Sequence, residues 1–213
     1  MIRIKAVLGL AAVGLFSCQL QARDFEDVEI EVFKIADTIY LLRGRGGNIG
    51  VSVGPDGVFL VDDQYAPLTE KIKAAVSGIS DRPIRFVLNT HYHGDHTGGN
   101  ENLGKAGVVV VSQDNVRKRL VHQLPELGFQ ALPIVTFSET VTFHINGDEV
   151  YAFHTPQAHT DGDTIVLFRN AKVVHMGDVF FNRMYPRIDL DAGGSVRGVL
   201  DAIDTVLSET DDD

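Results

Sequence analysis

The chain has 213 residues, of which 44% are hydrophobic and 23% are charged, and its formal net charge at pH 7 is −10. This composition excludes a globally disordered chain and supplies enough apolar side chains for the core of one large domain. Because the charge is negative and no run of Lys or Arg occurs, nucleic acid is not an expected partner, and a small molecule is favoured.

The first 22 residues have the three parts of a signal peptide. Arg3 and Lys5 form a basic start, residues 6–16 are an apolar run, and Ala22 offers a small residue at the cleavage site. The run is too short for an ordinary transmembrane helix. We therefore predict export, with the periplasm as the destination, and a mature domain over residues 23–213. The loss of Arg3 and Lys5 changes the net charge from −10 to −12.

Cys18 is the only cysteine and lies within the predicted signal peptide. Cleavage after Ala22 leaves a chain without a thiol, which suits an oxidising compartment. Residues 15–18 (Leu-Phe-Ser-Cys) loosely resemble a lipoprotein box, so a lipid anchor at Cys18 is one alternative. A buried N-terminal helix is the other.

The first third of the mature chain has the patterns of β-strands. Alternation of apolar and polar residues predicts strands over 28–34 and 38–42, and short apolar runs predict strands over 49–53 and 58–61. Between the last two, residues 54–57 (Gly-Pro-Asp-Gly) have the chemistry of a turn. We therefore predict a β-meander here.

After residue 62 the patterns of helices and strands alternate. Apolar residues at helical spacing predict helices over residues 68–79, 115–124 and 196–207. Short apolar or alternating runs predict strands over residues 85–89, 108–111, 135–145, 150–153, 165–168 and 173–175. The order predicts one α/β domain built of two sheets with helices outside them.

Residues 91–96 read His-Tyr-His-Gly-Asp-His, directly after the predicted strand 85–89. Neutral imidazole is the commonest protein ligand for zinc, and a carboxylate supplies an oxygen ligand. In an extended turn His91 and His93 can point the same way, whereas Asp95 and His96 reach a neighbouring point as the chain enters a helix. One short segment can then serve two metal ions, and the density of ligands disfavours the alternative of a solvated polar loop.

This motif and its strand-before, helix-after context resemble the metallo-β-lactamase superfamily. Three further segments share the resemblance: residues 158–163 (Ala-His-Thr-Asp-Gly-Asp), residues 175–178 (His-Met-Gly-Asp) at a strand end, and the turn before Asp62-Asp63. It covers the chain from about residue 28 to Asp213. The resemblance implies an α/β fold, a four-layer αββα sandwich with a dinuclear metal cleft at one edge.

The resemblance also implies two Zn²⁺ ions per chain. Six side chains, all His or Asp, would hold them: His91, His93 and His159 the first ion, Asp95 and His96 the second, and Asp178 between the two. Two zinc ions about 3.5–4 Å apart lower the pKa of a shared water and polarise a carbonyl. A carboxylate between them, here Asp178, offsets part of their charge. Asp95 would orient the water and handle its proton, which makes it the expected catalytic residue.

Residues near these ligands are expected to support them. Metal-bound histidines are usually oriented by a hydrogen-bond partner, and the candidates are Asp63, Asp161 and Asp163. His154 and His175 are expected to be structural or to act through a ligand, and Tyr92 is expected to pack. The glycines of the motif, Gly94, Gly98 and Gly99, are expected to allow close backbone approach.

Two features depart from the zinc β-lactamases. Those enzymes usually have cysteine at the position of Asp178, whereas aspartate is the pattern of glyoxalase II, lactonase-like and related hydrolases. The superfamily also supplies a further histidine to the second zinc from a loop after the last predicted helix, and no such residue precedes Asp213. We therefore expect a domain that is incomplete at its C-terminus and lacks its last strand and helix.

These observations predict an exported, dinuclear zinc hydrolase of a small cyclic amide, ester or thioester. One alternative is an iron-dependent oxidoreductase of the same fold, because His and Asp ligands also suit iron. The other is a non-catalytic metal-binding module.

Overall fold

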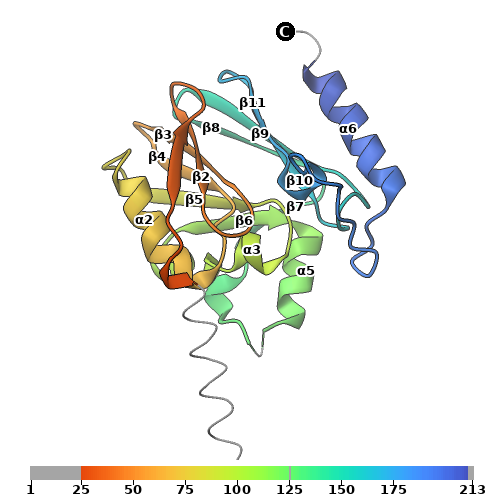
Figure 1. The fold of residues 1–213 in the computed structure, drawn as a ribbon, viewed down its shortest axis with the longest axis horizontal. Helices are drawn as coiled ribbons and strands as arrows, with labels where there is room; N and C mark the ends of the chain where they lie inside the picture. Colours follow the sequence, from red (N-terminus) through yellow and green to blue (C-terminus); the bar gives the residue numbers. More distant parts are fainter. Residues whose placement is uncertain (1–24, 125, 211–213) are drawn as a thin grey trace, which may run out of the picture.

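The computed structural model describes residues 25–124 and 126–210 (Figure 1). The predicted signal peptide, residues 1–22, and the alternative lipid site at Cys18 lie outside the described residues. No helix within the described ranges combines the length and hydropathy needed to cross a membrane.

Seven strands form the larger sheet, in spatial order from β1 to β7. They are β1 (Glu31–Lys34), β2 (Ile39–Arg43), β3 (Ile49–Gly54), β4 (Gly57–Val61), β5 (Ile84–Asn89), β6 (Val109–Gln113) and β7 (Val135–Phe137). The first four pair antiparallel, which confirms the predicted meander. The strands from β4 to β7 pair parallel, so their carboxyl ends meet at one edge of the sheet.

Four antiparallel strands form the smaller sheet, in the order β11-β10-β9-β8. They are β8 (Thr140–Ile145), β9 (Asp148–His154), β10 (Thr164–Phe168) and β11 (Val173–His175). Side chains of both sheets meet in one buried cluster, in which Phe59 and Leu88 of the larger sheet join Val150, Val166 and Phe168 of the smaller one. The two sheets therefore pack face to face.

Helices cover the two outer faces. The α-helices are α2 (Thr69–Ser77), α3 (Gly94–Thr97), α4 (Asn100–Lys105), α5 (Asp114–His122) and α6 (Val196–Thr210), and the 3-10 helices are η1 (Ala66–Leu68), η2 (Phe129–Ala131) and η3 (Gly177–Val179). Ile72 and Val76 of α2 pack on the larger sheet, whereas Val199 and Val206 of α6 pack on the smaller one. Figure 1 shows α6, in blue, on the side away from α2. The four layers confirm the predicted αββα sandwich.

Two details differ from the sequence prediction. The single strand predicted over 135–145 is wrong, because β7 belongs to the larger sheet and β8 to the smaller one. The alternation of apolar and polar residues continues from β7 into β8 without a break, because Phe137 and Ile145 both face the core between the sheets. Helix α4 was not predicted: Leu103 is its one buried apolar residue, which leaves no periodic pattern to detect.

Candidate metal centre

The His-rich segment follows β5 and changes conformation at His93. Residue His93 has extended backbone (φ −62°, ψ 147°), and α3 begins at Gly94, as the sequence predicted. The buried Asn89 side chain donates a hydrogen bond to the His96 carbonyl at 3.0 Å, and Thr97 Oγ1 donates to the His93 carbonyl at 3.1 Å. These bonds fix the turn that presents the histidine side chains at the edge of the sheet.

Three imidazole nitrogens converge at this edge. Nδ1 of His93 lies 3.0 Å from Nε2 of His91 and 3.1 Å from Nε2 of His159, which comes from the loop between β9 and β10. With zinc–nitrogen bonds of about 2.0–2.1 Å, tetrahedral ligand nitrogens lie about 3.3 Å apart. The observed spacing therefore fits a single metal ion held by the three rings.

Two of these rings have their other nitrogen next to an oxygen that can only accept. Nε2 of His93 lies 2.9 Å from Oδ2 of Asp189, and Nδ1 of His159 lies 2.8 Å from the carbonyl oxygen of Arg187. Each ring must donate its N–H to that oxygen, because a carbonyl and a carboxylate have no proton to give. In the neutral rings, the nitrogens that face the centre therefore carry lone pairs.

The ring of His91 is oriented in the same way, with its outward nitrogen donating its N–H. Thr90 Oγ1 donates to Asp62 Oδ2 at 2.8 Å and lies 3.1 Å from Nδ1 of His91, so the hydroxyl accepts from that ring. Burial, together with the neighbouring imidazoles, lowers the pKa of His91 well below its usual value. The ring is therefore neutral at pH 7, which is the form that binds a metal. Three lone pairs face one another, and a metal cation held between them would satisfy all three.

A second group lies beside the first and consists of His91, His96 and Asp178. Oδ1 of Asp178 is 3.2 Å from Nε2 of His96, and its Oδ2 is 3.7 Å from Nε2 of His159. The Asp178 carboxylate thus lies between the two groups, where a bridging ligand is expected. Asp178 is delivered by η3, directly after β11 of the smaller sheet.

His96 gives an independent test of whether a metal fits here. Its Nδ1 lies 2.7 Å from Oδ2 of Asp62, and its buried Nε2 faces the Asp178 carboxylate, with Oδ1 at 3.2 Å. Burial disfavours a charge on the His96 ring, but Asp62 and Asp178 outweigh it and raise the pKa of His96 well above its usual value. Two carboxylates therefore face this ring, and their negative charge would favour a metal cation bound at Nε2 of the neutral ring.

The structure brings five of the six predicted ligands into the two groups and places the sixth, Asp95, at their margin. Oδ2 of Asp95 is 3.6 Å from Nε2 of His96. Asp95 is partly exposed to the neighbouring cleft, unlike His96, which is buried.

The residues that orient the rings are not the three carboxylates expected from the sequence. The carboxylates of Asp62 and Asp189 contact imidazoles, whereas those of the expected Asp63, Asp161 and Asp163 do not. Asp63 accepts from the backbone N–H of Gly99 at 2.9 Å, and Asp163 shapes the turn after His159 by accepting from the backbone and hydroxyl of Thr160. Asp161 pairs with Arg119. No local signal marks Asp189, which is 96 residues from His93.

The structure also bears on the expectations for the two further histidines, the glycines of the motif and Tyr92. His154 and His175 each contact a backbone carbonyl, that of Asp163 or Asn48, and neither belongs to the two groups of ligand side chains. Among the glycines, Gly98 and Gly99 lie against backbone atoms of residues 63–65 and 94, where a Cβ would not fit. Gly94 faces open space, so its expected role is wrong. Tyr92 does more than pack, because its hydroxyl donates to Asp189 at 3.1 Å.

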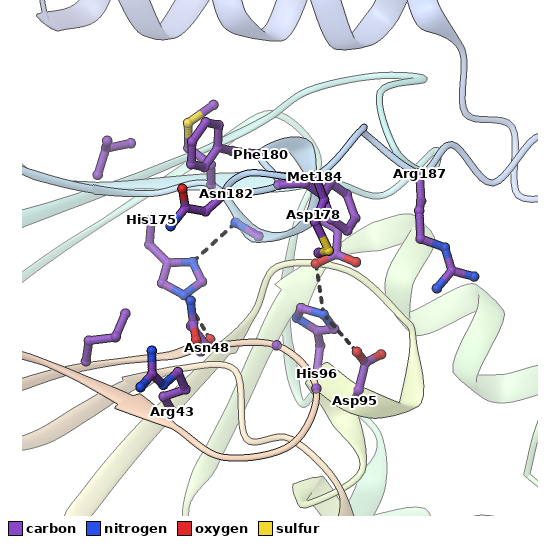
Figure 2. A pocket seen from close by; sticks show the side chains of 17 residues that line it. Arg43, Asn48, Asp95, His96, His175, Asp178, Phe180, Asn182, Met184 and Arg187 are labelled. Carbon is purple, nitrogen blue, oxygen red and sulfur yellow. Dashed lines mark hydrogen bonds and ion pairs between the residues drawn. The ribbon is translucent and has the colours of Figure 1, made fainter. Parts of the chain in front are cut away.

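A cleft of about 800 Å³ opens over the second group. Figure 2 shows His96, Asp95 and Asp178 close together, with the Arg187 side chain to one side of them. Phe180 and Met184 add apolar surface, and both are largely exposed. The loop 46–48 forms the opposite wall. The site therefore joins a cluster of metal-ligand side chains to a cavity of the size that binds small molecules.

The four-layer sandwich and the paired His/Asp groups define a metal-binding α/β fold. The chain belongs to the metallo-beta-lactamase superfamily, whose sequence model matches residues 42–212. Solved structures agree: a metallo-beta-lactamase from Pontibacter korlensis (TM-score 0.72, 21% identity, 85% of this chain and 86% of that one) and the DIM-1 metallo-beta-lactamase (TM-score 0.74, 16% identity, 87% and 86%) share the fold.

Two curated relatives have related sequences. A hydroxyacylglutathione hydrolase of Pelagibacter ubique is 29% identical over 146 residues, which are 67% of this chain and 51% of the relative. A lactamase-like protein of Emericella nidulans, aptB, is 25% identical over 160 residues, which are 70% of this chain and 48% of the relative. The chain thus spans about half the length of these two relatives.

Proposed function

We propose that this protein is a zinc-dependent hydrolase that cleaves a small cyclic amide, an ester or a thioester. The observation that carries the proposal is the convergence of the unprotonated nitrogens of His91, His93 and His159, with Asp178 between this group and His96. The family and a relative named as a hydrolase support the reaction class.

His91, His93 and His159 would hold one ion, and His96 with Asp178 would hold the other. Bound zinc ions lower the pKa of a shared water and polarise a substrate carbonyl. Asp95 borders the cleft, with Oδ2 at 3.6 Å from Nε2 of His96. In this position Asp95 Oδ2 can accept a hydrogen bond from the attacking water, take its proton and pass that proton to the leaving group.

The cleft indicates which molecules fit. Phe180 and Met184, which are 60% and 67% exposed, provide apolar surface that a substrate can contact. Arg43 of the same cleft is paired with Glu31 at 2.8 Å, whereas the Arg187 guanidinium has no ion-pair partner within the part of the chain described here. We therefore favour a substrate with an apolar portion and a negatively charged group that Arg187 can bind.

Export to the periplasm, based on residues 1–22, is also part of this proposal.

Asp178 supports an acyl ester or thioester more than a β-lactam, because zinc β-lactamases usually have cysteine there. The donor set contains no thiolate, and imidazole with carboxylate also suits iron. An iron-dependent oxidoreductase is therefore the second candidate, and a non-catalytic metal-binding module is the third.

One experiment separates these functions. The protein is purified without added metal, its zinc and iron contents are measured, and hydrolysis of β-lactams, lactones and thioesters is assayed beside the His93→Ala variant. Bound zinc with hydrolysis that His93→Ala abolishes supports the proposal. Iron with oxygen-consuming activity would favour the oxidoreductase, and bound metal without any turnover would favour the binding module.

A further inference from the structure

We propose that Asp189 is a positioning residue for the three-histidine group, and that Tyr92 acts on the metal only through it. The inference rests on the proposed metal site. It assigns a role to two residues that supply no metal ligand and do not border the cleft.

The Asp189 carboxylate receives three hydrogen bonds. Oδ2 accepts from Nε2 of His93 at 2.9 Å and from the Tyr92 hydroxyl at 3.1 Å, and Oδ1 accepts from the backbone N–H of Ala192 at 2.9 Å. Because the carboxylate is held on both oxygens, it presents a fixed acceptor to His93. The ring is thereby kept in the tautomer with its proton on Nε2, which leaves Nδ1 available at the centre of the cluster.

Tyr92 is itself held by helix α5. The Arg119 guanidinium carbon lies 5.1 Å from the centre of the Tyr92 ring. Arg119 also makes two parallel bonds with Asp161, from Nε to Oδ1 at 2.7 Å and from Nη2 to Oδ2 at 2.9 Å. Asp161 is two residues after His159. The chain of contacts therefore links the segment that carries one histidine ligand to the segment that carries another.

The backbone around Asp189 holds the same pair of histidines. The N–H of Asp189 donates to the His159 carbonyl at 2.9 Å, and the Arg187 carbonyl accepts from Nδ1 of His159. Gly194 ties this segment to the His159 backbone: its N–H donates to the Asp189 carbonyl at 2.8 Å, and it packs so closely that a Cβ there would lie 2.2 Å from the His159 carbonyl oxygen. Residues 187–189 thus orient two of the three rings.

A positioning role for Asp189 predicts two effects on metal binding that a loss of ordinary packing would not produce. If Asp189 sets the His93 tautomer, its removal should weaken metal binding even where the chain stays folded. If Tyr92 acts through Asp189, its removal should matter only while Asp189 is present, so that the two effects are not additive.

Binding of Co²⁺ to the metal-free protein tests both points, with affinity measured by chelator competition and ligand geometry by the visible absorption spectrum. The variants are Asp189→Ala, Asp189→Asn, Tyr92→Phe and the Asp189→Ala/Tyr92→Phe double variant. Asp191→Ala is the matched control, because Asp191 lies in the same loop and is exposed. Thermal unfolding of each metal-free variant shows whether it is folded.

We expect Asp189→Ala to weaken the first Co²⁺ by about 10–100-fold and to alter its spectrum. Asp189→Asn, which keeps one acceptor oxygen, should recover part of this loss, and the double variant should bind no more weakly than Asp189→Ala alone. Unchanged affinity and spectrum in folded Asp189→Ala would overturn the inference, as would additive effects in the double variant. Wild-type protein that binds no Co²⁺ would overturn the metal site itself, which is a different result.

Discussion

Nδ1 of His96 lies 2.7 Å from Oδ2 of Asp62, and this contact decides which nitrogen of His96 can meet a metal ion. The other oxygen of Asp62 accepts from the backbone N–H of Thr90 at 2.7 Å. Asp62 is fully buried and has a positive φ of 66°, so its side chain is aimed by an unusual backbone conformation. The tautomer of His96 therefore depends on a residue that lies in a different part of the sequence.

Asp62→Asn should weaken the second metal while the fold persists. Asparagine tolerates the positive φ, but its NH₂ group must face either His96 or the Thr90 N–H. Facing His96, it would force the ring proton onto Nε2 and block the ligand atom. Zinc stoichiometry by native mass spectrometry should fall toward one per chain, with activity down by at least about tenfold. Normal zinc content in the folded variant would show that Asp62 does not set the tautomer.

His93→Ala should abolish hydrolysis and remove most bound metal, because it deletes one of three converging nitrogens. We expect zinc affinity to fall by more than about 100-fold, beyond the usual effect of a supporting residue. His122→Ala is the matched control, since His122 is exposed on α5. Near-normal turnover at full metal occupancy in His93→Ala would contradict the assignment of the three-histidine group.

Gly47→Ala should reduce activity without touching a ligand. A Cβ at Gly47 would lie 2.3 Å from Cε1 of His96, and the buried ring cannot yield because Asp62 holds it. We expect weaker binding of the second zinc and activity lower by about tenfold or more. Gly94→Ala, within the His-rich motif itself, should be nearly neutral, because a Cβ there meets nothing within 4 Å. The opposite ranking of the two variants would refute this account of the cleft wall.

Asp178→Ala should lower the zinc count toward one per chain. The carboxylate contacts His96 on one side and His159 on the other, so its removal takes a ligand from both groups and leaves the charge of two ions less compensated. Equilibrium dialysis against Zn²⁺ measures the change. An unchanged count would show that Asp178 does not lie between two ions.

The sequence predicts most of the site because its ligands follow strands at short, regular spacing. Four of the six lie within residues 91–96, where the exit from β5 and the start of α3 set their directions. The fold is predicted for a similar reason, since its strands alternate or are continuously apolar.

The remaining features depend on contacts that are distant in sequence. The pairing of His93 with Asp189 joins residues 96 positions apart, and neither side chain carries a local sign of it. The change of sheet between β7 and β8 leaves no mark in the sequence pattern, because Phe137 before it and Ile145 after it face the same core. The direction of Arg187 is set by a loop whose backbone is fixed through His159.

The most direct measurement is X-ray diffraction from crystals of the protein grown with Zn²⁺, with anomalous difference maps calculated on both sides of the zinc absorption edge. The account predicts a zinc peak bounded by Nε2 of His91, Nδ1 of His93 and Nε2 of His159, and a neighbouring peak between Nε2 of His96 and Asp178. A protein that takes up zinc only at other residues, with no peak among the three histidines, would contradict it.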